Sequence, residues 1–146
     1  MFNSGRRRAI KSLDVEISRA KRFGYYVGIL LLDVDASIPR GVHKDLPGVT
    51  VNVEHIRNLL REYDIVFKTK LRRYTVILPH LEEGESARVV RDRLKFTSWI
   101  KEWGSVNIGI AIYPVQGQSS KELFKAAERD LKDTIAEDLS EEGKTY

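Results

Sequence analysis

Apolar residues recur along the chain with two spacings, and these spacings predict where helices and strands lie. Near the amino terminus, Ile10, Leu13 and Ile17 repeat every three or four residues, which is the spacing of one helical face. Gly24 follows at a position where helices commonly stop. We therefore expect a strongly basic leading helix over residues 1–24.

A mostly apolar run from Tyr25 to Asp33 has the length of a strand and is too continuous to have one wet face. Two short β-rich runs, 64–69 and 72–78, are separated only by Lys70 and Leu71, which is hairpin spacing, and Pro79 is expected to end the second run. The pattern before the hairpin predicts a helix that ends at Tyr63, with Val53, Ile56, Leu59 and Leu60 on its inner face. After the hairpin, the pattern predicts a helix over 82–103, a strand over 106–113 and a helix over 119–139. Trp99 and Trp103 of the helix over 82–103 are expected to cover the edge of the core.

The order of these elements predicts the fold class. After the leading helix, the chain reads strand, helix, strand, strand, helix, strand and a final helix. This βαββαβ core is typical of α+β folds of the ferredoxin-like and polymerase-palm type, with a central antiparallel sheet flanked by helices. The 146 residues can be buried around one core. We therefore predict a single domain over 1–146, with its core over 25–139 and a polar tail over 140–146.

The composition narrows the setting of this domain. It is 42% hydrophobic and 32% charged, as in soluble globular proteins. The absence of Cys excludes disulfides and thiolate metal sites and fits a cytoplasmic location. The longest apolar run, 27–32, is far shorter than the roughly 20 residues that span a bilayer. The three histidines, His43, His55 and His80, lie too far apart in sequence to indicate a metal site.

Several short motifs follow one another in a specific order. The first predicted strand ends in Leu-Leu-Asp33-x-Asp35, then come Arg61-x-x-Asp64 and a hairpin that ends in Ile-Leu-Pro79. Residues 107–114 read Asn-Ile-Gly-Ile-Ala-Ile-Tyr-Pro. This succession resembles the GGDEF domain of diguanylate cyclases over about residues 13–131. The resemblance implies a palm-like fold, and an activity in which two GTP-loaded domains make cyclic di-GMP with metal ions.

The chain departs from the family where the chemistry would occur. The resemblance places the family's first metal-binding aspartate at Asp33, and the five letters of the GGDEF motif on Lys70, Leu71, Arg72, Arg73 and Tyr74. Because Mg²⁺ requires anionic oxygen ligands, arginines cannot replace the acidic letters. The other positions that the resemblance assigns to nucleotide contacts carry Ile38, Gly41, Val49 and Ile135.

These losses predict that the domain is not an enzyme, has no catalytic residues and holds no metal or cofactor. Asp33, Asp35, Lys70, Arg72 and Arg73 then form a vestigial active-site region. Strand alternation puts one hairpin arginine on the side of Asp33 or Asp35, so we expect an arginine to pair with an aspartate in place of the metal.

Arg61 and Asp64 match the spacing of the family's inhibitory site for cyclic di-GMP. Arginine can bind a phosphate or a guanine edge, and aspartate can accept hydrogen bonds from guanine. The predicted helix after the hairpin offers further arginines for such a site, among them Arg88 and Arg91. An equally simple interpretation is that Arg61 and Asp64 pair with each other.

The sequence thus favours an inactive GGDEF-like signalling domain that acts as a regulatory or receptor module, with cyclic di-GMP as its candidate ligand. Alternatives are a structural, dimerising or protein-interaction domain without a nucleotide, and a residual GTP-binding cyclase. The net charge of +4 and the basic hairpin leave nucleic-acid binding as a weaker alternative. By the resemblance, the leading helix could be a stalk to an upstream sensor. A protein partner, a sensor domain or a second copy of the chain is therefore expected.

Overall fold

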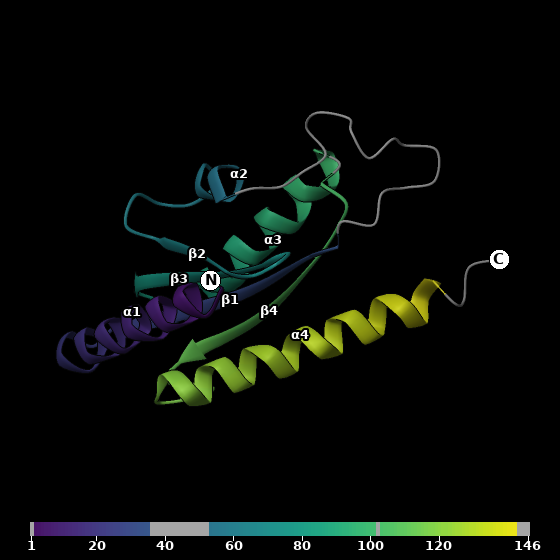
Figure 1. Cartoon of the computed structure of the whole chain (residues 1–146). Coiled ribbons are helices and arrows are strands. Elements are labelled where there is room, and N and C mark those ends of the chain that lie inside the picture. The colour runs from purple at the N-terminus through teal and green to yellow at the C-terminus, as the bar shows by residue number, and fades with distance from the viewer. Residues whose placement is uncertain (1, 36–52, 102, 143–146) are drawn as a thin grey trace.

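A computed structural model describes residues 2–35, 53–101 and 103–142. They form one four-stranded antiparallel sheet in the order β2-β3-β1-β4, flanked by helices (Figure 1). The α+β palm-like class is therefore confirmed. In chain order the elements are α1 (Phe2–Phe23), β1 (Tyr26–Asp35), α2 (Val53–Arg57), β2 (Ile65–Lys70), β3 (Arg73–Leu81), α3 (Glu85–Ile100), β4 (Ser105–Tyr113) and α4 (Ser120–Glu142).

Strand β1 lies in the middle of the sheet, as its apolar sequence predicts. It pairs with β3 on one side and with β4 on the other, both antiparallel. Ile29 and Leu30 are adjacent residues that point to opposite faces, and both are fully buried. Strand β1 is therefore buried on both faces and contributes residues to both core clusters.

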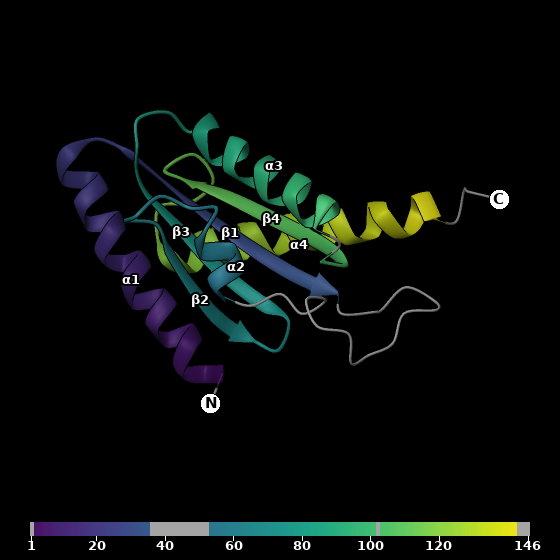
Figure 2. The same ribbon diagram turned by 90° about the horizontal axis from the view of Figure 1, so that it is seen from above.

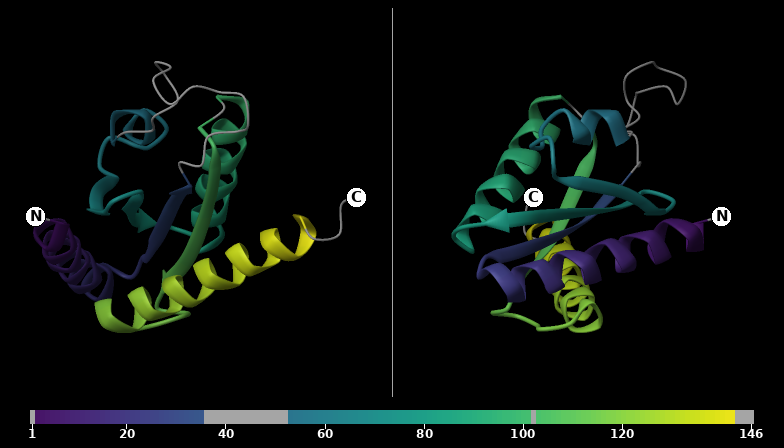
Figure 3. Two further views of the ribbon diagram at one scale, coloured as in Figure 1. Left: turned by 45° about the vertical axis from the view of Figure 1, so that its right-hand side comes forward. Right: turned by 90° about the vertical axis from the view of Figure 1, so that its left-hand side faces the viewer.

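The helices cover the sheet on both sides (Figures 1 and 3). Helices α1 and α4 pack on one face, around a core cluster that includes Leu13, Ile29 and Leu131. Helices α2 and α3 lie over the other face, whose cluster includes Leu30 and Leu94. In the part of the chain that the structure describes, no helix is both long and apolar enough to cross a membrane.

Two glycines have clear structural roles. Gly24 ends α1 with a φ of +76°, and its N–H donates to the carbonyl of Ala20 at 2.8 Å. This conformation is easy for glycine and unfavourable for residues with a Cβ. Gly109 lies on β4 where α4 crosses it, and an added Cβ there would collide with the carbonyl oxygen of Ala127. The glycine of the 107–114 motif is thus explained by helix packing.

The prediction that Pro79 ends its strand is wrong, because β3 continues to Leu81. The pairing of β3 with β1 shifts its register between Leu78 and Leu81, and His80 in this bulge has a φ of +56°. A bulge is a place where a strand tolerates proline, since no regular ladder hydrogen bond is lost there.

The second helix is shorter than predicted, because α2 ends at Arg57 and not at Tyr63. The guanidinium of Arg57 donates hydrogen bonds to the carbonyl oxygens of Glu62 and Asp64. These bonds hold the following residues in a turn that leads directly into β2.

The third helix is also shorter than predicted, since α3 spans only Glu85–Ile100. After the helix, the chain turns so that Trp103 packs into the core with 8% exposure, whereas Trp99 remains 76% exposed. The expectation that both tryptophans cover the edge of the core holds for Trp103 alone.

Candidate functional site

Asp33 lies near the end of β1, in a row of polar side chains that crosses three strands. Its register neighbours are Arg73 on β3 and Asn107 on β4. Strand alternation places all three on the face that α1 and α4 cover, at the end of the sheet next to the hairpin. Two of its members, Asp33 and Arg73, belong to the region that the resemblance assigns to the active site.

The hairpin turn falls on Leu71 and Arg72, one residue later than predicted, because Lys70 already pairs with Arg73. Arg72 has a φ of +65°, and its carbonyl accepts a hydrogen bond from the N–H of Val34 at 2.8 Å. The turn is therefore tied to β1 through backbone. Lys70 and Arg72 are exposed, and neither forms an ion pair with any residue that the structure describes.

A hairpin arginine pairs with an aspartate, as predicted, and the structure identifies the two residues as Arg73 and Asp33. Its Nε and its Nη2 both lie 3.2 Å from Oδ2 of Asp33. The two side chains are partly exposed, at 35% and 26%. The guanidinium of Arg73 thus binds the carboxylate to which the resemblance assigns a metal ion.

Asn107 is the member of this row whose role the sequence did not reveal. Its side chain is buried, and its Oδ1 has no hydrogen-bond partner. It is the one polar residue inside the otherwise apolar strand β4, which is the signal that could have identified it. Only the register between β1 and β4 shows that it lies beside Asp33.

The other expected positions fall differently. Ile135 on α4 packs against the core cluster under the sheet. Ile38, Gly41 and Val49 lie outside the described residues, as does the side chain of Asp35, whose backbone pairs with Ser105. Among the described residues, no group of three or more His, Cys, Asp or Glu side chains is placed to hold a metal ion.

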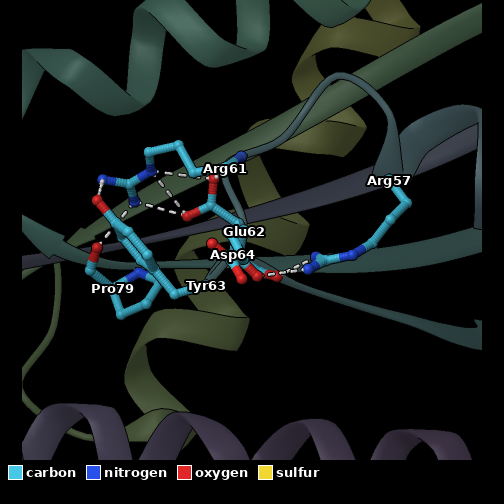
Figure 4. A network of polar contacts seen from close by, with 6 residues as sticks. All are labelled: Arg57, Arg61, Glu62, Tyr63, Asp64 and Pro79. Atoms are coloured by element: carbon cyan, nitrogen blue, oxygen red, sulfur yellow. Dashed lines mark hydrogen bonds and ion pairs between the residues drawn. The ribbon is translucent and has the colours of Figure 1, made fainter.

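Arg61 and Asp64 form a closed structural unit (Figure 4). The carboxylate of Asp64 accepts from Nε of Arg61 at 3.0 Å, from Nη2 at 2.6 Å and from the backbone N–H of Arg61 at 2.8 Å. The side chain of Asp64 has no exposed surface, whereas that of Arg61 is 33% exposed. Asp64 therefore closes the turn between α2 and β2.

The rest of the guanidinium of Arg61 is also engaged. Nη2 donates to the carbonyl of Pro79 at 2.8 Å, and Nη1 donates to the hydroxyl of Tyr63 at 3.3 Å. The Tyr63 ring lies 4.6 Å from the guanidinium carbon. Burial alone would lower the pKa of Arg61, but hydrogen bonding to Asp64 and the charge of Asp64 raise this pKa above its usual value.

Arg88 and Arg91 on α3 do not join this unit. Nε of Arg88 lies 3.3 Å from Glu85, and Nε of Arg91 lies 3.1 Å from Asp92. Both arginines form exposed ion pairs on their own helix. The contacts given for Arg88 and Arg91 are therefore with their own helix, and not with Arg61 or Asp64, with which the sequence grouped them.

Comparison with solved structures finds this fold in GGDEF domains. The GGDEF domain of TpbB, also called YfiN, from Pseudomonas aeruginosa matches with a TM-score of 0.78 and 23% sequence identity, over 90% of this chain and 84% of that chain. The diguanylate cyclase SiaD from the same species, in complex with its activator SiaC, matches with a TM-score of 0.71 and 19% identity, over 90% of this chain and 55% of that chain. A sensory box/GGDEF family protein from Caulobacter crescentus has a TM-score of 0.66 and 13% identity, over 88% of this chain and 90% of that chain. No family model and no curated protein sequence matches the chain.

These likenesses establish the fold. With identities below 25%, they show that the chain has the architecture of GGDEF domains, as the resemblance predicted. What the site does has to be argued from its own residues.

Proposed function

We propose that this chain is a non-catalytic domain of the GGDEF fold that regulates other proteins through direct contact. The observation that carries the proposal is the ion pair between Arg73 and Asp33. Phosphoryl transfer from GTP needs divalent ions that neutralise charge on the phosphates, and such ions need anionic ligands. Here the carboxylate already faces a cation that is part of the chain.

The charges around Asp33 argue against a metal ion in a second way. Lys70 and Arg72 precede Arg73 in sequence and carry two further positive charges on the hairpin. A divalent cation close to Asp33 would be repelled by Arg73 at a separation where like charges cost about 1 kcal/mol or more, even in water. Expelling Arg73 would also leave its guanidinium without this partner.

A regulatory role through contact fits the remaining features of the fold. One of the matched structures, the diguanylate cyclase SiaD, is in complex with its activator SiaC, which supports a protein partner for this chain as well. In this chain each face of the sheet carries an apolar core cluster. A stable scaffold with a neutralised centre can still present its outer helices to a partner.

The test is an assay for binding and product together. The purified chain is incubated with GTP and Mg²⁺, the products are separated by chromatography, and GTP binding is measured by calorimetry with and without Mg²⁺. We expect no cyclic di-GMP and no Mg²⁺-dependent heat. Product formation, or a GTP affinity that requires Mg²⁺, would overturn the proposal.

A narrower candidate is a receptor for cyclic di-GMP at Arg61. It is favoured by the exposed ring of Tyr63 beside the guanidinium, a pairing on which a guanine base could stack. A ligand at this place would have to bind without Asp64, which is buried, or separate Asp64 from Arg61. The hydrogen bonds of Asp64 therefore favour regulation through protein contact over a receptor for cyclic di-GMP.

The receptor is tested by calorimetry with cyclic di-GMP. Tyr63→Ala removes the exposed ring and leaves the contacts between Arg61 and Asp64 in place, whereas Arg19→Ala, at an exposed arginine of α1 outside the candidate site, serves as the control. A receptor at Arg61 requires heat in the wild type, a loss of at least about tenfold in affinity in Tyr63→Ala, and no change in Arg19→Ala. We expect no heat in any of the three proteins.

A further inference from the structure

The start of α1 lies against the second half of the edge strand β2. An added Cβ at Gly5 would collide with the carbonyl oxygen of Lys68. The guanidinium carbon of Arg8 lies 5.6 Å from the centre of the Phe67 ring. The start of α1 and the turn between β2 and β3 therefore share one end of the molecule, as the right-hand view of Figure 3 shows.

This end of the molecule carries cations that form no ion pair with any described residue. They are Arg7, Arg8, Lys70 and Arg72, and all four side chains are exposed. Because the side chains of a helix tilt toward its amino end, Arg7 and Arg8 extend toward this end of the molecule. Leu71 lies in the turn between Lys70 and Arg72 and is 65% exposed. We call these five residues the basic end.

The described carboxylates do not balance this charge. Asp33 and Glu128 are already paired with other arginines of the region, at 3.2 and 3.7 Å. Asp14 lies further along α1, away from the turn. Asp133 and Glu137 are exposed on the second half of α4, and Figure 2 shows that α4 ends on a different side of the molecule from the start of α1. The basic end therefore presents a net positive surface with an apolar side chain in it.

We propose that the basic end docks on the surface of a lipid bilayer that contains anionic phospholipids, with Leu71 inserted among the headgroups. Each lysine or arginine close to such a surface is attracted by its negative potential. An exposed leucine adds to the binding when it leaves water for the acyl boundary. This inference goes beyond the proposed function and does not depend on it.

The side chains at the basic end favour a bilayer over a nucleic acid. Proteins bind single-stranded nucleic acids with exposed aromatic rings on which the bases stack. The aromatic residues nearby do not offer such rings, because Tyr74 is buried and Phe67 is partly buried beneath the guanidinium of Arg8. Leu71 gains nothing from a phosphate backbone, whereas in a bilayer it is removed from water.

The number of groups involved limits the strength of the docking. One basic residue near an anionic surface strengthens binding about fivefold, so four such residues and one leucine give a reversible association. Salt screens this attraction, because the exposed charges interact over only about 10 Å at 0.1 M ionic strength. Binding should therefore depend on both the anionic lipid and the salt concentration.

Flotation of the purified chain with lipid vesicles tests the proposal. The vesicles contain phosphatidylcholine with about 30% phosphatidylglycerol, and vesicles of phosphatidylcholine alone are the neutral reference. At about 100 mM salt we expect the wild type to float with the anionic vesicles and not with the neutral ones, and at about 500 mM salt we expect this binding to be lost. A wild type that does not float with the anionic vesicles at the lower salt overturns the proposal.

Charge reversal identifies the surface that binds. Arg7→Glu combined with Arg72→Glu should weaken vesicle binding at least about a hundredfold, because two attractions become repulsions. The matched control combines Lys21→Glu with Lys121→Glu, two exposed lysines at the end of α1 and the start of α4. Each reversal removes two charge units, so both double variants lower the net charge of +4 by the same four units. The control should bind within about threefold of the wild type. Equal losses in the two double variants would overturn the proposal, because net charge alone would explain them.

Leu71→Asn tests the insertion of the hairpin turn. The substitution keeps every charge of the basic end and, at an exposed position, leaves the core unchanged. We expect about tenfold weaker binding to the anionic vesicles, because an asparagine gains little from leaving water. Unchanged binding in Leu71→Asn would contradict the proposal. So would a wild type that binds a mixed-sequence oligonucleotide at the same salt concentration and does not float with the vesicles.

Discussion

The chain contains two arginine–aspartate pairs that look alike in sequence and differ in structure. In the pair of Arg61 and Asp64, the carboxylate has no exposed surface and accepts both side-chain and backbone hydrogen bonds. In the pair of Arg73 and Asp33, the carboxylate is 26% exposed, and one of its oxygens receives both contacts. The first pair closes a turn, and the second lies at an open end of the sheet.

An arginine–aspartate pair can therefore stabilise the fold when its carboxylate is buried, or contribute little to stability when its carboxylate is partly exposed. A buried carboxylate depends on its partner, because losing the partner leaves an unpaired charge without water. A partly exposed pair is screened by solvent and contributes little to stability. The motif Arg61-x-x-Asp64 therefore has a structural role here, whereas the pair of Arg73 and Asp33 is the one on which the proposed loss of metal binding depends.

The largest effect is expected from Arg61→Ala. The substitution leaves the charge of Asp64 buried, with only a backbone N–H as its donor, and also removes the bond to the carbonyl of Pro79. We expect a loss of about 2–4 kcal/mol in the free energy of unfolding, measured by urea denaturation. Arg91→Ala is the control, since its exposed pair with Asp92 should change stability by less than about 0.5 kcal/mol.

Double-mutant cycles compare the two pairs directly. We expect a coupling of about 2 kcal/mol or more between Arg61 and Asp64, and of less than about 1 kcal/mol between Arg73 and Asp33. The cycles use alanine at each position and urea denaturation as the readout. Equal couplings would contradict the distinction between a structural pair and an occupying pair.

Arg73→Ala should have a small effect on stability, under about 1 kcal/mol, because Asp33 can be solvated when its partner is removed. Arg72→Ala is the matched control, since Arg72 is a neighbouring exposed arginine outside the pair. A loss of more than about 2 kcal/mol in Arg73→Ala would show that the hairpin pair also holds the fold together.

The smallest effect concerns alkaline pH. Burial raises the pKa of Tyr74, the aromatic residue next to Arg73, above its usual value. Tyrosine in the unfolded chain ionises near pH 10, so stability should be constant below that pH and fall as the pH rises toward the folded pKa. The slope from one such group cannot exceed about 1.4 kcal/mol per pH unit. Tyr74→Phe should reduce the slope, and Tyr25, whose pKa is also raised, should retain part of it.

Much of the fold could be predicted because its signals are local. The apolar run that became β1, the helical spacing of α1 and the stop at Gly24 all depend on neighbouring residues. The extension of β3 through Pro79 could not be predicted, since it depends on a register shift against β1. The early end of α2 depends on bonds from Arg57 to residues beyond the helix.

The candidate site divides in the same way. Strand alternation was enough to place one hairpin arginine on the side of Asp33 or Asp35, but it did not tell which arginine and which aspartate pair. The position of Asn107 beside Asp33 required the pairing of β1 with β4, which are 70 residues or more apart in sequence. The burial of Asp64 was also hidden, because a motif of four letters does not reveal which of its side chains faces the interior.

Metal binding tests most directly whether Arg73 has replaced a metal ion at Asp33. Mn²⁺ can stand in for Mg²⁺, and its binding is followed by the loss of the free-ion signal in electron paramagnetic resonance. For the wild type we expect no binding up to about 1 mM Mn²⁺, with or without GTP, and for Arg73→Glu a measurable affinity that Asp33→Asn removes. Binding of Mn²⁺ to the wild type below 1 mM, abolished by Asp33→Asn, would contradict this replacement.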